Sequence, residues 1–200
     1  RHDRRLVIFE EIGGMPQVVF QGLTEVRSSG YVQVSKIEQK TRRARVRMIA
    51  ISNPPEAREI ASYTFGIESA IGVIGTHQDL SRFDLTMILG KKDINQEKLS
   101  GFLQNPPQVE HKYNDDDCQR LILKAWKCES VKFESTKFIL ETSLKLVSIF
   151  GDGLPILDPN STHVKIARLA SALAARTCSY DENETLIVRN CHVEYIEKFL

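Results

Sequence analysis

The stretch Leu6-Val7-Ile8-Phe9-Glu10-Glu11 decides the fold that we expect for this chain. Four consecutive apolar residues are typical of a short strand that is buried on both faces in the centre of a parallel sheet. Two carboxylates follow at the C-terminal end, where open α/β sheets place their ligand sites. Burying both would be costly unless a cation or hydrogen-bond donors met them. The stretch therefore predicts either a site for a divalent metal carrying nucleotide phosphates or, more simply, the start of a solvated loop.

The composition is that of an ordinary globular protein. The chain has 200 residues, of which 42% are hydrophobic and 26% are charged, and this length suits one large domain or two small ones. The net charge is only +1, so any affinity for nucleic acid has to come from a local patch. The sequence contains no signal peptide and no apolar run of membrane length. We therefore expect a cytoplasmic protein with no membrane partner.

The cysteines do not indicate a metal site or a disulfide framework. Their spacing gives no C-x-x-C pair and no zinc-type pattern with the histidines. We expect reduced, mostly buried thiols. They are Cys118, Cys128, Cys178 and Cys191.

The first half of the chain has the pattern of a mixed α/β structure. Apolar residues at helical spacing predict a helix over residues 15–27, and Gly30 follows it as glycine commonly follows a helix C-terminus. Extended patterns come next. Strands are predicted over residues 31–37, 45–52 and 85–89, and the first two are joined by a polar, charged turn over residues 38–43.

The second half has the pattern of a helical domain. A boundary is indicated near residues 95–115 by Asn105-Pro106-Pro107 and by the acidic run at residues 115–117. Helices are predicted over residues 116–127, 135–150 and 162–177, with Asn190 capping a last helix that ends at Leu200. The sequence therefore predicts an α/β half over residues 1–100 and an all-helical half over residues 101–200.

The order of these motifs resembles a known ATPase family. After Leu6–Glu11 come a helix, a basic hairpin, Ala50-Ile51-Ser52-Asn53-Pro54 and Leu80-Ser81-Arg82-Phe83-Asp84. This order is similar to the second half of the AAA+ module of minichromosome maintenance (MCM) helicases, in particular the divergent MCM-like ATPases of prokaryotes and mobile elements. The resemblance spans most of the chain, more loosely over residues 100–160. It implies the C-terminal half of a AAA+ P-loop NTPase core, with a parallel sheet and a hairpin insert, followed by an all-helical lid.

The resemblance assigns roles to the polar residues that follow the first two predicted central strands. Glu11 matches the Walker B glutamate, which polarises the water that attacks the γ-phosphate of ATP. Glu10 stands where the family has an aspartate that holds Mg²⁺, and its extra methylene changes the reach of the carboxylate. Asn53 matches the sensor-1 asparagine. The alternative is that the two glutamates begin a solvated loop and that Asn53 caps the end of its strand.

Three cationic residues are assigned to the nucleotide in the same way. Arg82 matches the arginine finger, which projects into the nucleotide of a neighbouring subunit. The alternative is a salt bridge between Arg82 and Asp79 or Asp84. Arg168 in the lid matches the sensor-2 arginine, and Lys165 is the alternative because the alignment slides by three residues. For both lid residues, a solvated helix face is the competing interpretation.

The basic stretch between residues 36 and 47 is the candidate DNA contact. In MCM proteins the hairpin before sensor 1 points into the central channel, and Lys36 stands at the position of its DNA-contacting lysine. Lys40 and Arg42 continue the basic stretch. Backbone contacts by Lys and Arg give salt-dependent, sequence-independent binding, as a translocating motor requires. The alternative is an ordinary charged hairpin.

The phosphate-binding loop of an ATPase is not present in the sequence. Such a loop has the pattern G-x-x-x-x-G-K-S/T, and Gly90-Lys91-Lys92 lacks its first glycine and its hydroxyl. In AAA+ order the loop precedes Walker B, so we expect it upstream of Arg1 in a longer ATPase. The alternative is a truncated, inactive relative. In either case we expect that these 200 residues do not hydrolyse ATP alone.

The resemblance as a whole implies an ATP-driven, Mg²⁺-dependent DNA helicase or translocase. Its protomers would form a homo-oligomeric ring, a hexamer in the family, with ATP held between neighbouring copies. One alternative is a AAA+ protein remodeller or regulator without helicase activity. Another is a non-catalytic ring subunit, which Glu10 and the pair Gly13-Gly14 would favour.

Overall fold

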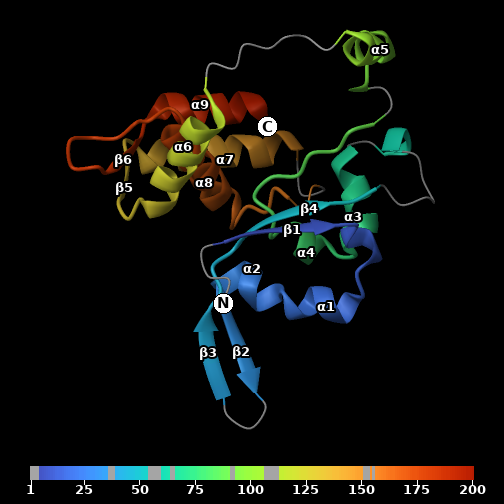
Figure 1. The fold of residues 1–200 in the computed structure, drawn as a ribbon. Helices are drawn as coiled ribbons and strands as arrows, with labels where there is room; N and C mark the ends of the chain where they lie inside the picture. Colours follow the sequence, from blue (N-terminus) through green and yellow to red (C-terminus); the bar gives the residue numbers. More distant parts are fainter. Residues whose placement is uncertain are drawn as a thin grey trace. The chain divides into compact units, whose positions relative to one another are not determined.

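The protein has a mixed α/β fold with short parallel sheets. The computed structural model describes residues 5–35, 39–53, 60–63, 66–90, 93–105, 113–150, 154 and 156–200. The chain separates into two compact units, Arg1–Ile88 and Leu89–Leu200 (Figure 1). The division thus comes before the boundary at residue 100 that the sequence suggests.

The first unit is built on two parallel strands. Strand β1 (Leu6–Glu10) pairs with β4 (Arg47–Ile51), and Ile8 lies opposite Ile49 (Figure 1). The run of apolar residues predicts strands that are buried on both faces, and this prediction is wrong. Side chains along each strand alternate between half-buried and exposed. In the described part of the chain, only one face of this pair is covered. The core on that face consists of Ile12, Phe20, Ala70, Ile74 and Leu80.

Two short helices replace the single helix predicted over residues 15–27. Helices α1 (Gln17–Gly22) and α2 (Thr24–Ser29) are separated at Leu23. Glycine is a weak helix former, so the break beside Gly22 has a local cause. The second helix ends at Gly30, whose φ of 71° is the left-handed conformation typical of a helix C-terminus.

A separate antiparallel hairpin follows. Strand β2 (Tyr31–Ser35) pairs with β3 (Gln39–Arg43), so the turn predicted over residues 38–43 is wrong: most of it forms a strand. A charged segment can form a strand when its side chains project into solvent, and Lys40 to Arg43 are all exposed.

The remainder of the first unit consists of short helical turns. They are the 3₁₀ turns η1 (Ile12–Gly14), η2 (Ile60–Ser62) and η3 (Gly66–Glu68), and the helices α3 (Ser69–Ile74) and α4 (His77–Leu80). The strand predicted over residues 85–89 is wrong. A strand requires a hydrogen-bonded neighbour, and none of the described strands pairs with this segment.

The second unit is helical around a very small sheet. Its helices are α5 (Gln96–Gln104), α6 (Asp115–Lys127), α7 (Thr136–Phe150), α8 (Thr162–Arg176) and α9 (Asn190–Phe199). The three helices predicted from apolar spacing are confirmed as α6, α7 and α8. The last predicted helix is confirmed as α9, but its N-cap is Arg189 and not Asn190, which is the first residue of the helix. The short strands β5 (Val131–Phe133) and β6 (Leu186–Val188) pair in parallel, so the prediction of an all-helical half missed them.

One hydrophobic core holds α7, α8, α9 and β6 together. Ala170 and Ala174 on α8 are completely buried, which lets the neighbouring helices approach closely. The cysteines are free, but the prediction that most are buried is wrong: Cys118, Cys178 and Cys191 are exposed. Among the described residues, no helix combines the length and apolar character needed to cross a membrane.

Candidate functional site

The carboxyl ends of β1 and β4 bring two of the predicted site residues into contact. The register places Glu10 opposite Ile51, so the residues that follow the two strands leave the sheet at the same edge. There the side-chain amide of Asn53 donates a hydrogen bond to Oε1 of Glu11 over 3.1 Å. Both residues are exposed, so this carboxylate and amide are accessible to a ligand.

The backbone at Glu11 has an unusual conformation. Its φ and ψ of 54° and 47° are left-handed, which a residue with a Cβ rarely adopts. Such conformations persist where the surroundings hold them, and they are often found at functional sites. Here they turn the chain sharply from β1 into η1.

A second contact fixes the loop after β1 against the end of β4. The N–H of Gly13 donates to Oγ of Ser52 over 3.1 Å. A Cβ at position 13 would lie only 3.0 Å from the same oxygen, so any other residue there would require the Ser52 hydroxyl to shift by a few tenths of an ångström. Two hydrogen bonds therefore tie this loop to the end of β4, one through Glu11 and one through Gly13.

This edge has some of the groups that a magnesium–nucleotide site needs. Glu10 ends β1 and is exposed beside Glu11. In the described residues there is no group of three or more His, Cys, Asp or Glu side chains that could hold a metal ion. Mg²⁺ bound with a nucleotide needs fewer protein ligands, because one or two carboxylates act together with waters and phosphates. Glu10 and Glu11 therefore fit Mg²⁺ that arrives with phosphates, and they do not form a complete protein cage.

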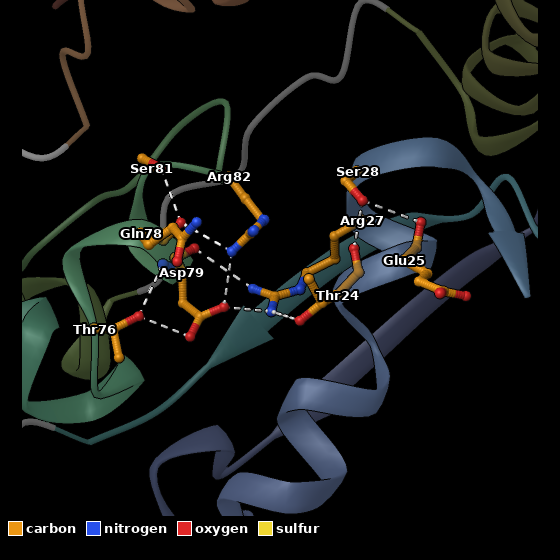
Figure 2. A network of polar contacts seen from close by, with 9 residues as sticks. All are labelled: Thr24, Glu25, Arg27, Ser28, Thr76, Gln78, Asp79, Ser81 and Arg82. Carbon is orange, nitrogen blue, oxygen red and sulfur yellow. Dashed lines mark hydrogen bonds and ion pairs between the residues drawn. The ribbon is translucent and has the colours of Figure 1, made fainter.

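Arg82 lies in a polar network just after α4 (Figure 2). Its Nη1 donates to Oδ1 of Asp79 and to the carbonyl of Gln78, each over 3.2 Å. The salt bridge between Arg82 and Asp79 that the sequence left as an alternative is thus formed. The Arg82 side chain is nevertheless 23% exposed, so the ion pair does not remove it from solvent.

Asp79 is the centre of this network. Nη2 of Arg27 donates to Oδ1 of Asp79 over 2.7 Å, and the hydroxyl of Thr76 donates to Oδ2 over 2.8 Å (Figure 2). The Asp79 and Arg27 side chains are 9% and 5% exposed. Burial alone would raise the pKa of Asp79, but the hydrogen bonds from Thr76 and Arg27 and the charges of both arginines outweigh it, so the pKa is lowered. Asp79 is therefore ionised at neutral pH.

Sequence reasoning did not identify Arg27 as part of this network. Its guanidinium also lies over the ring of Phe20, 4.1 Å from the centroid. An arginine in the last turn of a predicted helix looks like an ordinary surface charge. The only signal in the sequence was the proximity of Asp79 to Arg82.

The hairpin presents the predicted DNA contacts on one side of a strand. Lys40 and Arg42 are exposed and two residues apart on β3, so their side chains leave the same face. Arg43 leaves the opposite face, where Tyr31 is its cross-strand neighbour. Lys36 lies outside the described residues.

The two lid candidates are on α8, in the second unit, and differ in exposure. Lys165 is buried, at 7% exposure, and its Nζ donates to the carbonyl of Ile156 over 2.6 Å. Arg168, one turn further along α8, is exposed. Of the two, Arg168 has the more accessible side chain.

No protein-family model matches the chain, and no curated protein matches it. The function of the three sites in the first unit is therefore inferred from their geometry and from the order of motifs in the sequence. These sites are the Glu11–Asn53 edge, the Arg82 network and the basic hairpin.

Proposed function

We propose that this chain is part of a AAA+ ATPase of the MCM-helicase type, which hydrolyses ATP between the protomers of a ring and moves along DNA. The observation that carries the proposal is the hydrogen bond between Asn53 and Glu11. These residues are 42 positions apart in the sequence and follow different strands. The resemblance names Glu11 as the Walker B glutamate, which polarises the attacking water, and Asn53 as the sensor-1 asparagine, whose amide can orient that water or touch the γ-phosphate. Their direct contact supports that pairing.

The chemistry proposed for this edge is the activation of a water molecule. Phosphoryl transfer depends mainly on positioning and on electrostatic stabilisation. The carboxylate of Glu11 would accept a hydrogen bond from the attacking water, and the amide of Asn53 holds that carboxylate in place. Mg²⁺ bound with ATP supplies positive charge at the phosphates, and Glu10 is the residue that would help to hold it.

Arg82 would act on the nucleotide of the neighbouring protomer. A guanidinium suits a phosphoryl group because its planar fork can donate two parallel N–H···O hydrogen bonds to two phosphate oxygens and carries the opposite charge. The side chain of Arg82 is partly exposed, as this role requires. Arg168 would reach the nucleotide from the lid.

The hairpin would bind the DNA backbone. Lys40 and Arg42 are two residues apart on β3, which corresponds to a distance of about 6.8 Å along the strand. Two successive nucleotides of one DNA strand rise by about the same distance. Contacts of this kind recognise phosphates and not base sequence. They suit a protein that steps along its substrate.

The experiment that tests the proposal uses a protein in which these residues follow a phosphate-binding loop, as the proposal expects. Replacing Glu11→Gln keeps the size of the side chain and an acceptor for Asn53 but removes the charge. We expect turnover to fall by about 100-fold or more while nucleotide binding is retained. The control is Glu25→Gln, at an exposed position on α2, which should leave turnover unchanged. Normal turnover of the Glu11→Gln enzyme would refute the proposal.

The same assay separates a helicase from a protein remodeller. The variant Lys40→Ala with Arg42→Ala should remove the stimulation of ATP turnover by DNA and leave the basal rate. If DNA does not stimulate the unmodified enzyme at all, the remodeller alternative is favoured.

A further inference from the structure

Arg82 is held at one corner of its guanidinium. An arginine has five N–H groups, of which Nη1 carries two. Those two are used by Asp79 and by the carbonyl of Gln78. No other hydrogen bond joins Arg82 to the described part of the chain, so Nε and Nη2 remain available. Together Nε–H and Nη2–H form the fork that grips two oxygens of a phosphate or carboxylate.

Arg27 is bound to the same carboxylate in a different way. Its two terminal nitrogens both have acceptors, its ring-facing side lies on Phe20, and only 5% of its side chain is exposed. Its Nε is buried without a hydrogen bond in the structure. Arg27 therefore has no edge to offer to a ligand outside the unit. Its position is that of a counter-charge.

The charges of the network do not balance. Two guanidinium groups share one carboxylate, which leaves one positive charge in excess. The contact from Arg27 to Asp79 is the shorter, 2.7 Å against 3.2 Å for Arg82, and it is the more deeply buried. Arg27 therefore compensates most of the charge of Asp79, and the excess charge resides on the more exposed Arg82.

Asp79 is also fixed on its other side. The hydroxyl of Thr76 donates a hydrogen bond to Oδ2 of Asp79. It also accepts one from the backbone N–H of Asp79 over 3.0 Å, and this second bond caps α4. The carboxylate is thus held by its own helix and by α2 at once. Because the carboxylate of Asp79 is held on both sides, it can orient the guanidinium of Arg82.

Building on the proposed role of Arg82 as an arginine finger, we propose that Arg27 and Asp79 are positioning residues for it. Arg27 neutralises Asp79, and Asp79 holds Nη1 of Arg82, so that the fork of Nε and Nη2 is oriented before a nucleotide arrives. A donor that is already oriented needs no reorganisation when charge develops on the phosphate. The pair acts through Arg82 and touches neither nucleotide nor metal.

The first test measures the mobility of Arg82 in the 200-residue chain by NMR relaxation of arginine Nε–H groups. The positioning pair is removed by combining Arg27→Met with Asp79→Leu, because apolar replacement of a whole buried ion pair is commonly tolerated. We expect Arg82 to be as rigid as the backbone in the unmodified chain and clearly mobile in the variant, with core signals of Ile12 and Ile74 unchanged. Arg120, exposed on α6, is the mobile reference. If Arg82 is as mobile as Arg120 in the unmodified chain, the inference is overturned.

Asp79→Asn is the second variant, should the double replacement fail to fold. It keeps an oxygen for Nη1 of Arg82 and removes the charge. We expect Arg82 to have intermediate mobility in this variant. An Arg82 as rigid as in the unmodified chain would show that the charge of Asp79 does not hold it, and would equally overturn the inference.

The second test is a double-mutant cycle on ATP turnover in the protein in which this chain follows a phosphate-binding loop. We expect the Arg27→Met, Asp79→Leu variant to lower kcat by about 10-fold to 100-fold with KM unchanged, since small misplacements of a catalytic group have effects of this size. The variant that combines all three substitutions should have the same turnover as the single Arg82→Ala variant. Losses that multiply would show an independent structural effect and overturn the inference. Normal turnover of Arg82→Ala would instead refute the proposed role of Arg82 itself, so the two failures are distinguishable.

Discussion

Replacing Glu11→Gly should be almost neutral for stability, unlike the same change at an ordinary glutamate. At Glu11 the left-handed backbone costs a residue with a Cβ about 1–2 kcal/mol, which glycine recovers. Against this, glycine loses about 0.5–1 kcal/mol more backbone entropy on folding. The lost hydrogen bond from Asn53 costs about 0.5–1 kcal/mol. These contributions cancel to about zero in the free energy of unfolding.

The matched control is Glu25→Gly in α2. Glu25 lies within a right-handed helix, so glycine relieves no strain there and destabilises by about 1 kcal/mol. We therefore expect the Glu11→Gly chain to be about 1 kcal/mol more stable than the Glu25→Gly chain. Urea unfolding should be followed by the methyl signals of Ile12 and Ile74, which lie in the core of the first unit, because the single tryptophan, Trp126, belongs to the second unit. Equal destabilisation by the two substitutions would refute the strain at Glu11.

Three further predictions concern the other contacts of the first unit. Gly13→Ala should destabilise the unit by about 1–2 kcal/mol and loosen the loop of Glu11, because its Cβ would press on Oγ of Ser52, whereas Gly14→Ala, with open space around it, should not; urea midpoints measure both, and equal effects would contradict the packing. Lys40→Ala with Arg42→Ala should weaken DNA binding and reduce the slope of log K against log salt by about 2, while Lys132→Ala on β5 should leave fluorescence anisotropy titrations unchanged; an unchanged slope would exclude the hairpin as the phosphate contact. The lowered pKa of Asp79 means that its contribution to stability is complete above the usual value of 3.8 and is lost as the pH falls through the folded-state pKa. The stability difference between the unmodified chain and Asp79→Asn should therefore be largest at neutral pH and shrink below pH 3.8, and a difference independent of pH would show that Asp79 is not ionised.

The parts of the fold that depend on local periodicity could be predicted from the sequence. Helices α6, α7 and α8 follow from apolar residues spaced three and four apart, which is a property of each segment alone. Strands β5 and β6 have three residues each and pair across more than fifty positions, so no local pattern identifies them. The segment at residues 85–89 shows the converse. Its apolar residues favour a strand, but a strand exists only where a partner pairs with it.

The candidate site divides in the same way. The contact of Asn53 with Glu11 could be anticipated, because parallel neighbours bring their carboxyl ends to one edge. The left-handed backbone of Glu11 could not, since nothing in a pair of glutamates indicates it. Nor could the bond of Arg27 to Asp79, which joins two short helices 52 positions apart. Which charges meet depends on how these helices pack, and that is decided by the whole core.

The distribution of thiols gives this protein a practical advantage. All four cysteines belong to the second unit, and Cys118, Cys178 and Cys191 are exposed. A maleimide dye added to the unaltered chain will therefore mark that unit alone and leave Glu11, Arg82 and the hairpin chemically untouched. One cysteine introduced on the hairpin after removal of Cys128 and of two of the exposed cysteines would provide a donor–acceptor pair for single-molecule energy transfer. The distance between the two labelled positions could then be measured before and after nucleotide and DNA are added.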